Sequence, residues 1–240
     1  MSAAEADTAP SVALRTYPSS ETLAKALSDR VANSLAERLK IKPRVVLAVS
    51  GGTTPLLFFQ AVSASKIDWR SVDVVPVDER WVEADSPRSN ARLIRAHLLQ
   101  NEAGAARFTP LASDVPTPED GLAAVAAGLD ALALPPDVAI LGMGEDGHTA
   151  SFFPRGEGLA AALDPHNDRK AAIVRAASVP EPRVTLTFAV LGAAGFLALH
   201  IEGEAKLRAL RAAQGPGPVE DMPIRAFLRR RQPLETFWRA

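Results

Sequence analysis

The stretch DVAILGMGEDGHTASFFP, residues 137–154, decides how this chain folds and where its chemistry lies. It opens on the apolar run 138–141, which is typical of a strand buried in a parallel sheet. Glycines at positions 142, 144 and 147 follow, and they let the backbone turn sharply and approach a ligand closely. Because ligands of open α/β sheets bind beyond the carboxyl ends of the strands, we predict a binding site in this loop.

His148 is the candidate general base of the loop, and it stands two residues after Asp146. Imidazole titrates near neutral pH, so this side chain can accept a proton at cellular pH. A lone histidine is more often structural or exposed than catalytic, but the glycine-rich loop favours catalysis here. We read His97, His166 and His200 as lacking glycines and a carboxylate around them. Asp146 could orient the His148 ring, although the spacing alone does not show it.

The same three glycines also spell GxGxxG after a strand, the pattern of a dinucleotide-binding loop. That pattern requires a full helix after the third glycine and an acidic residue at the end of the next strand. Here Pro154 follows the loop, and the next strand-like run, 171–174, ends at Arg175. We therefore predict no nicotinamide or flavin cofactor.

A second loop with ligand-binding character follows the buried run RVVLAV at 44–49. Its residues are Ser50, Gly51, Gly52, Thr53 and Thr54. Pro55 suits the first turn of a helix that Thr54 would cap. Free amides at a helix start attract anions, so we favour a phosphate or carboxylate site over a plain strand-to-helix turn. The loop is not a Walker loop, since no Lys-Ser/Thr follows the glycines.

A third polar group, Asp78, Glu79 and Arg80, follows the predicted strand 72–77. Such a cluster is usually a solvated loop, but at this sheet edge Arg80 becomes a ligand candidate. Further strands are predicted at 108–111, 171–174, 184–188 and 196–201, and helices at 21–40, 89–99, 117–134 and 204–213. The alternation indicates one α/β domain, residues 11–240, with a mostly parallel, Rossmann-like sheet covered by helices on both faces. Residues 1–10 are predicted to be a disordered tail.

The composition narrows the classes of function. The 240 residues carry a net charge of −1, which does not favour nucleic acid or an anionic membrane as partner. The chain has no cysteine and its first residues do not resemble a signal peptide, so we expect a cytoplasmic protein. The uncharged segment 184–201 is broken by threonines and glycines and predicts two buried strands, not a membrane span. We assign no metal, because no cluster has metal-ligand spacing.

Six motifs, in this order along the chain, resemble those of the 6-phosphogluconolactonase family. They are VSGGTTP at 49–55, VDERWV at 77–82, SNARLIRAHLL at 89–99, LGMGEDGHTASFFP at 141–154, PRVTLT at 182–187 and GEAK at 203–206. The resemblance implies the three-layer α/β/α fold shared with glucosamine-6-phosphate deaminases and ribose-5-phosphate isomerases. It also implies hydrolysis of 6-phospho-D-glucono-1,5-lactone, a phosphorylated sugar lactone, in the pentose phosphate pathway without an organic cofactor.

By this resemblance, His148 takes a proton from the attacking water and returns it to the ring oxygen, while Asp146 helps to hold the imidazole. Amides of the 142–147 loop, Gly144 among them, are the first candidates for the oxyanion donors. The residues implied to bind the substrate, its phosphate included, are Ser50, Gly51, Gly52, Thr53, Asp78, Arg80, Asn90, Gly144, Arg183 and Lys206. The sequence neither divides the three cations between phosphate and sugar hydroxyls nor specifies an oligomeric state.

Two alternatives remain within the same fold. Deaminases carry a similar DGH element followed by Asn-Glu-Pro, whereas this chain has Phe152-Phe153-Pro154 and therefore lacks the glutamate. Deaminases also tend to have tyrosine where this chain has Arg80. A non-catalytic sugar-phosphate regulator would need a DNA-binding domain, and the segment before Glu21 is too short for a helix-turn-helix. These departures favour the lactonase.

Overall fold

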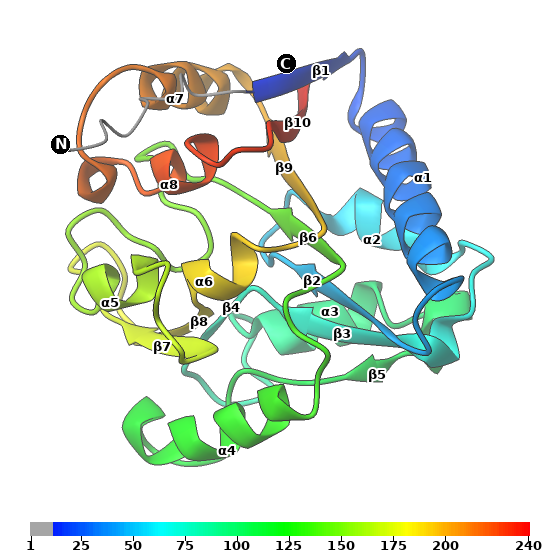
Figure 1. The fold of residues 1–240 in the computed structure, drawn as a ribbon, viewed down its shortest axis with the longest axis horizontal. Coiled ribbons are helices and arrows are strands. Elements are labelled where there is room, and N and C mark those ends of the chain that lie inside the picture. The colour runs from blue at the N-terminus through cyan, green and yellow to red at the C-terminus, as the bar shows by residue number, and fades with distance from the viewer. Residues whose placement is uncertain (1–11) are drawn as a thin grey trace, which may run out of the picture.

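The computed structural model describes residues 12–240 (Figure 1), and a seven-stranded sheet forms their centre. Every neighbouring pair of strands in this sheet is parallel. The strands, in order across the sheet, are β1 (Val12–Tyr17), β10 (Leu234–Arg239), β9 (Phe196–Glu202), β6 (Val138–Leu141), β2 (Val45–Val49), β3 (Val72–Pro76) and β5 (Arg107–Phe108). Because all the strands run the same way, their carboxyl ends meet at one edge.

Strand β2 shows why the central strands are apolar throughout. Its residues Val45, Leu47 and Val49 belong to one hydrophobic core, whereas Val46 and Ala48 belong to a second core on the opposite face. Successive side chains of a strand point to opposite faces. A strand that is covered on both sides therefore needs an unbroken apolar run, as the sequence analysis predicted for this segment.

Helices cover both faces of the sheet and make the three-layer α/β/α arrangement (Figure 1). Residues of α1 (Ser20–Leu39), α2 (Leu56–Ser63) and α3 (Asn90–His97) share one core with the sheet. The opposite core receives residues of α4 (Pro118–Asp130), α5 (Leu159–Leu163), α6 (Phe188–Leu191), α7 (Glu204–Gln214) and α8 (Ile224–Leu228). Short 3₁₀ turns lie at Trp69–Ser71, Asn101–Ala105 and Val219–Asp221. The predicted α/β class is confirmed.

A second, antiparallel sheet lies beside the first and was not anticipated. It has the order β4 (Asp78–Arg80), β8 (Arg183–Leu186) and β7 (Ala171–Val174). The predicted strands at 171–174 and 184–188 therefore exist, but they do not extend the parallel sheet. The register of β4 and β8 places Arg80 opposite Arg183, so this small sheet brings together two arginines from distant segments.

The sheet order reverses between β2 and β6. After β2 the chain continues to β3 and β5 on one side, and after β6 it continues to β9 and β10 on the other. At such a switch point the connecting loops diverge and leave a crevice at the carboxyl edge of the sheet. The two glycine-rich loops of the sequence, 50–54 and 142–148, follow β2 and β6 and therefore flank this crevice.

Helix starts show one success and one error of the sequence analysis. Thr117 caps α4 as predicted, and its side chain accepts a hydrogen bond from the Asp120 amide. Thr54 does not cap α2: the cap position belongs to Pro55 and has no side-chain hydrogen bond. The prediction was wrong because Thr54 lies one residue too early, and its hydroxyl accepts instead from Lys206.

Two strands of the seven-stranded sheet, β1 and β10, were not predicted from the sequence. β1 lies at the sheet edge with most of its residues exposed, and apolar and polar residues do not alternate clearly along it. β10 directly follows a basic and polar segment, so its short apolar pattern is weak in the sequence. β10 pairs with both β1 and β9, so the two ends of the described chain lie together in the sheet. The predicted tail, residues 1–10, lies outside the described residues. No helix within 12–240 has the length and apolar character that crossing a bilayer requires.

Candidate active site

A cleft of about 390 Å³ lies at the carboxyl edge of the sheet, above the switch point. Loops that follow β2, β3, β6 and β9 contribute to its walls, together with β8 of the small sheet. The predicted site residues that line it are Ser50, Gly51, Gly52, Thr53, Asp78, Arg80, Asn90, Gly144, His148, Arg183 and Lys206. Asp146 is not among the lining residues, but its carboxylate contacts His148, which is. Segments that are up to about 150 positions apart are thus gathered around one space.

His148 and Asp146 form a close pair at this cleft. Their Nδ1 and Oδ1 atoms are 2.6 Å apart, and the same Oδ1 accepts the His148 backbone N–H at 3.0 Å. Burial raises the pKa of Asp146, but the hydrogen bonds from the His148 ring and amide outweigh it and lower that pKa below its ordinary value. An ionised Asp146 accepts the Nδ1–H proton, which leaves Nε2 as the basic nitrogen of the ring.

The glycine loop leaves room for this pair. A Cβ atom on Gly144 would stand 2.2 Å from Cε1 of His148 and 2.6 Å from Oδ1 of Asp146. The Gly144 amide donates to the His148 carbonyl at 2.9 Å, and the Gly147 amide donates to the Gly144 carbonyl at 3.1 Å. Both amides are thus used inside the loop. This argues against Gly144 as an oxyanion donor and leaves Gly142 and Met143 as the cleft-lining candidates.

Phe153 links the histidine to the arginine side of the cleft. Its ring centroid lies 4.9 Å from that of His148, and the Arg183 guanidinium carbon lies 5.5 Å from the Phe153 centroid. The phenyl ring therefore packs near both the imidazole and the guanidinium. The deaminase pattern has a glutamate in this segment, where this chain has the aromatic residue Phe153.

Asp78 and Asn90 form a buried polar corner beside loop 50–54, the predicted anion site. Asp78 accepts the Ser151 hydroxyl at 2.5 Å, and Asn90 donates to the Asp78 carbonyl at 2.8 Å. The Asn90 Oδ1 atom has no partner among residues 12–240. A Cβ atom on Gly51 would stand 1.9 Å from this oxygen, so the corner depends on a glycine at that position. The free acceptor suits a sugar hydroxyl.

Glu79 organises this corner without facing the cleft. It is 1% exposed, and its carboxylate accepts the backbone amides of Asn90 at 2.7 Å and Ala91 at 2.6 Å. Burial raises the pKa of Glu79, and these amide hydrogen bonds partly offset the rise. The side chain ties the start of α3 to β4, and so it positions Asn90 and Arg80. From the sequence, Glu79 was predicted only as one member of the polar group that follows the strand 72–77.

The three predicted cations approach the cleft from two sides. Arg80 and Arg183 lie side by side on the small sheet, and the Nε atoms of both are buried without a partner in the described part of the chain. Burial lowers the pKa of Arg183, and the charge of Asp78 opposes that effect. Lys206, in the first turn of α7, donates to Thr54 Oγ1 at 3.4 Å, and burial lowers its pKa.

His200 also lines the cleft, and the sequence analysis passed over it. It is 2% exposed on β9, and its Nε2 lies 3.3 Å from Glu202 Oε1. The prediction that only His148 has glycines and a carboxylate nearby was wrong, because Glu202 and Gly203 stand two and three residues after His200. The apolar run before His200 hid this signal, whereas the pattern His-x-Glu-Gly at a strand end could have revealed it.

Metal binding finds no support in the side-chain arrangement. Within the described range, no three His, Cys, Asp or Glu side chains come together in a way that could hold an ion. The groups that line the cleft include two histidines, Asp78 and the side chains of Arg80, Arg183 and Lys206.

The comparisons place the chain in a family. A family model described as glucosamine-6-phosphate isomerases/6-phosphogluconolactonase matches residues 18–238. A 6-phosphogluconolactonase of Mesorhizobium japonicum is 53% identical over 223 residues, which are 92% of this chain and 93% of the relative. The chain belongs to the 6-phosphogluconolactonase family. A second relative in the family, from Rhizobium meliloti, is 46% identical over 92% of this chain and 96% of its own length.

Solved structures agree with this family assignment. A 6-phosphogluconolactonase from Shewanella baltica is 38% identical, with a TM-score of 0.93 over 97% of this chain and 99% of its own. A monomeric glucosamine-6-phosphate deaminase superposes with a TM-score of 0.76 at 17% identity, over 95% of this chain and 97% of its own. The second likeness shows that the two enzyme types share a fold.

Proposed function

We propose that this chain hydrolyses 6-phospho-D-glucono-1,5-lactone to 6-phospho-D-gluconate. The lactonase relatives support the reaction, and the His148–Asp146 pair at the cleft is the observation that carries the mechanism. A deaminase or isomerase activity is disfavoured because Phe152-Phe153-Pro154 stands where the deaminase pattern has its glutamate. A protein that only senses sugar phosphates is disfavoured because the similar relatives are lactonases.

The base reaction follows from the orientation of His148. Asp146 accepts the Nδ1–H, so Nε2 takes a proton from water as the water oxygen bonds to lactone carbon C1. The carbonyl electrons move to oxygen and form a tetrahedral oxyanion. When it collapses, the bond from C1 to the ring oxygen breaks, and Nε2–H returns the proton to that oxygen. Such acid–base help contributes on the order of 10²–10⁴-fold.

The phosphate is held, in this proposal, between the loop after β2 and the basic residues of the cleft. The amides of Gly51, Gly52 and Thr53 lie just before α2, where the helix start adds positive potential. Lys206 reaches the same loop through Thr54. Arg80 and Arg183 add charge from the small sheet, and arginine can bind phosphate with two parallel hydrogen bonds.

The test is hydrolysis of freshly made lactone by the wild type and by His148→Ala, each measured against the spontaneous rate. We expect rapid hydrolysis by the wild type and a fall in kcat of about 10²-fold or more in the variant. His97→Ala, a change on α3 away from the cleft, is the matched control. A wild type that never exceeds the background would overturn the activity, and glucosamine 6-phosphate would be assayed next. Full activity of His148→Ala would overturn only the mechanism.

A further inference from the structure

His200 is a buried titratable group that the proposed mechanism does not use. It lines the cleft together with Thr54, Pro55 and Lys206, all at the end where the phosphate is proposed to bind. Its Nδ1 is buried and has no hydrogen-bond partner among residues 12–240. The ring packs edge-on against Phe58 of α2, with the centroids 6.5 Å apart. An apolar side chain would fill that place without leaving a nitrogen unpaired.

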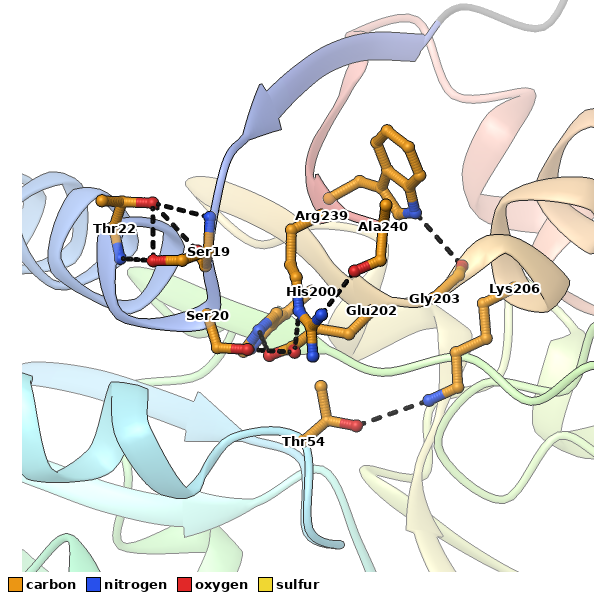
Figure 2. A network of polar contacts seen from close by, with 11 residues as sticks. Ser19, Ser20, Thr22, Thr54, His200, Glu202, Gly203, Lys206, Arg239 and Ala240 are labelled. Carbon is orange, nitrogen blue, oxygen red and sulfur yellow. Dashed lines mark hydrogen bonds and ion pairs between the residues drawn. The ribbon is translucent and has the colours of Figure 1, made fainter.

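The other ring nitrogen is engaged by an anchored carboxylate (Figure 2). Glu202 Oε1 lies 3.3 Å from His200 Nε2, and its second oxygen accepts Ser20 Oγ at 2.6 Å and Arg239 Nε at 2.7 Å. The hydrogen bond with His200, aided by those from Ser20 and Arg239 and opposed by burial, lowers the pKa of Glu202 to about 2. The ionised carboxylate accepts Nε2–H, so Nδ1 is the nitrogen left for another partner.

Three elements hold this arrangement in place. Glu202 is on the same strand as His200, Arg239 is on the neighbouring β10, and Ser20 begins α1. Figure 2 shows Lys206 and Thr54 beside this network. His200, Thr54 and Lys206 line the cleft, whereas Ser20, Glu202 and Arg239, which hold the ring through the carboxylate, are not among its lining residues.

We propose that His200 is a further substrate-binding residue, whose Nδ1 shares a proton with a phosphate oxygen of the bound sugar. The second pKa of a phosphate monoester is about 6, so near neutral pH the bound phosphate can be a monoanion or a dianion. Either the phosphate monoanion donates its hydroxyl proton to Nδ1, or Nδ1–H donates to the dianion. In both cases one proton lies between nitrogen and oxygen, and the Glu202 carboxylate balances the charge of the ring. The inference rests on the proposed function, because it assigns the phosphate to that end.

Two variants of similar size separate a polar contact from packing. His200→Leu removes both ring nitrogens, whereas His200→Asn keeps a polar group near the place of Nδ1. We expect His200→Leu to raise KM for the phosphorylated lactone about tenfold, the loss of roughly one hydrogen bond to a charged group, with kcat within about threefold. His200→Asn should recover part of that loss. His166→Leu, at an exposed position outside the cleft, is the control.

The unphosphorylated lactone, D-glucono-1,5-lactone, tests whether the effect belongs to the phosphate. A phosphate contact requires that His200→Leu leave kcat/KM for this substrate unchanged. An equal loss for both substrates, or no loss for either, would overturn the proposal and assign His200 a packing role. The failure of the proposed function looks different, because the wild type itself would then not exceed the background.

A direct reading comes from proteins labelled with ¹⁵N at histidine. The chain has four histidines, so the His200 signals can be assigned by their loss in His200→Asn. Addition of the product, 6-phosphogluconate, should shift the Nδ1 resonance of His200, whereas D-gluconate at the same concentration should not. Unchanged His200 nitrogens at saturating 6-phosphogluconate would contradict the contact, even if turnover is normal.

Discussion

Two histidines border the cleft, and each is paired with a carboxylate two positions away: Asp146 precedes His148, and Glu202 follows His200. The first pair lies in a glycine loop, with a ring-to-carboxylate distance of 2.6 Å and both side chains open to solvent. The second lies at the end of a strand, at 3.3 Å, with a histidine that is 2% exposed. The same two chemical groups are thus set in different environments.

The difference lies in what holds the carboxylate. The Asp146 carboxylate accepts hydrogen bonds from the ring and the amide of its own histidine, so its charge is available to the imidazolium that forms when His148 takes a proton. Glu202 is shared among His200, Ser20 and Arg239, and so it fixes a ring in place. A lightly held carboxylate suits a base that changes charge in each cycle, whereas a shared one suits a binding residue that keeps its position.

The largest expected effect comes from Asp146→Asn. The amide can still occupy the site, but it no longer supplies the negative charge that stabilises the protonated ring and selects its tautomer. We expect kcat to fall about 10- to 10³-fold with little change in KM, measured by steady-state kinetics above the spontaneous rate. Glu202→Gln is the matched change in the second pair, and it should leave kcat within about threefold. If the two variants lose kcat equally, the division of roles between the pairs is wrong.

The next effect tests the loop that shapes the first pair. In Gly144→Ala, the new Cβ would stand 2.2 Å from Cε1 of His148 and must displace the ring or the loop. We expect a loss of about tenfold or more in kcat, because small misplacements of a reacting group are costly. Gly104→Ala is the control, since Gly104 does not line the cleft and its new Cβ would have an ordinary nearest contact of 3.7 Å to the Leu99 carbonyl oxygen. Equal activity of the two variants would show that the ring does not need this space.

The smallest effect concerns stability and belongs to the second pair. The folded-state pKa of Glu202, about 2, lies below its ordinary value of 4.5, so its ionised form favours the native state. That contribution is fully present above about pH 4.5 and disappears as the pH falls towards 2. Glu202→Gln should therefore lower the stability at pH 7 by about 1–3 kcal/mol. The gap between wild type and variant should narrow below pH 4.5.

Urea unfolding between pH 7 and pH 3 measures this gap. Glu204→Gln is the matched control, because Glu204 is exposed two residues further along the chain. A gap between wild type and Glu202→Gln that stays constant over the whole pH range would show that the carboxylate charge contributes nothing to the fold.

Much of the fold could be predicted from the sequence because the central strands are apolar on both faces. The runs that became β2, β3 and β6, and the loops that follow them, were placed correctly for this reason. The edge strand β1 and the terminal β10 were missed, since a half-exposed strand and a strand after a basic run carry weak local patterns. The antiparallel pairing of β8 with β4 joins segments about 100 residues apart, so it could not be predicted from a local sequence pattern.

The candidate site divides in the same way. Residues that stand in glycine loops at strand ends, such as Gly51, Gly144 and His148, are prominent in the sequence, and the structure brings them to one cleft. Glu79 and His200 are not prominent, because their importance lies in partners on other elements. Their roles, like those of the other site residues, remain predictions that the experiments above address.

The sequence by itself determined the α/β class and the residues that carry charge or freedom of backbone at the strand ends, because strands, turns and glycine loops follow from neighbouring residues. The family came from the resemblance of six motifs, which the comparisons bore out. Only the tertiary structure decided that Asp146 occupies one nitrogen of His148, that Arg80 faces Arg183, and that His200 lies on the cleft with one nitrogen unpaired. Those arrangements depend on distances between distant segments, and the packing of the whole chain sets them.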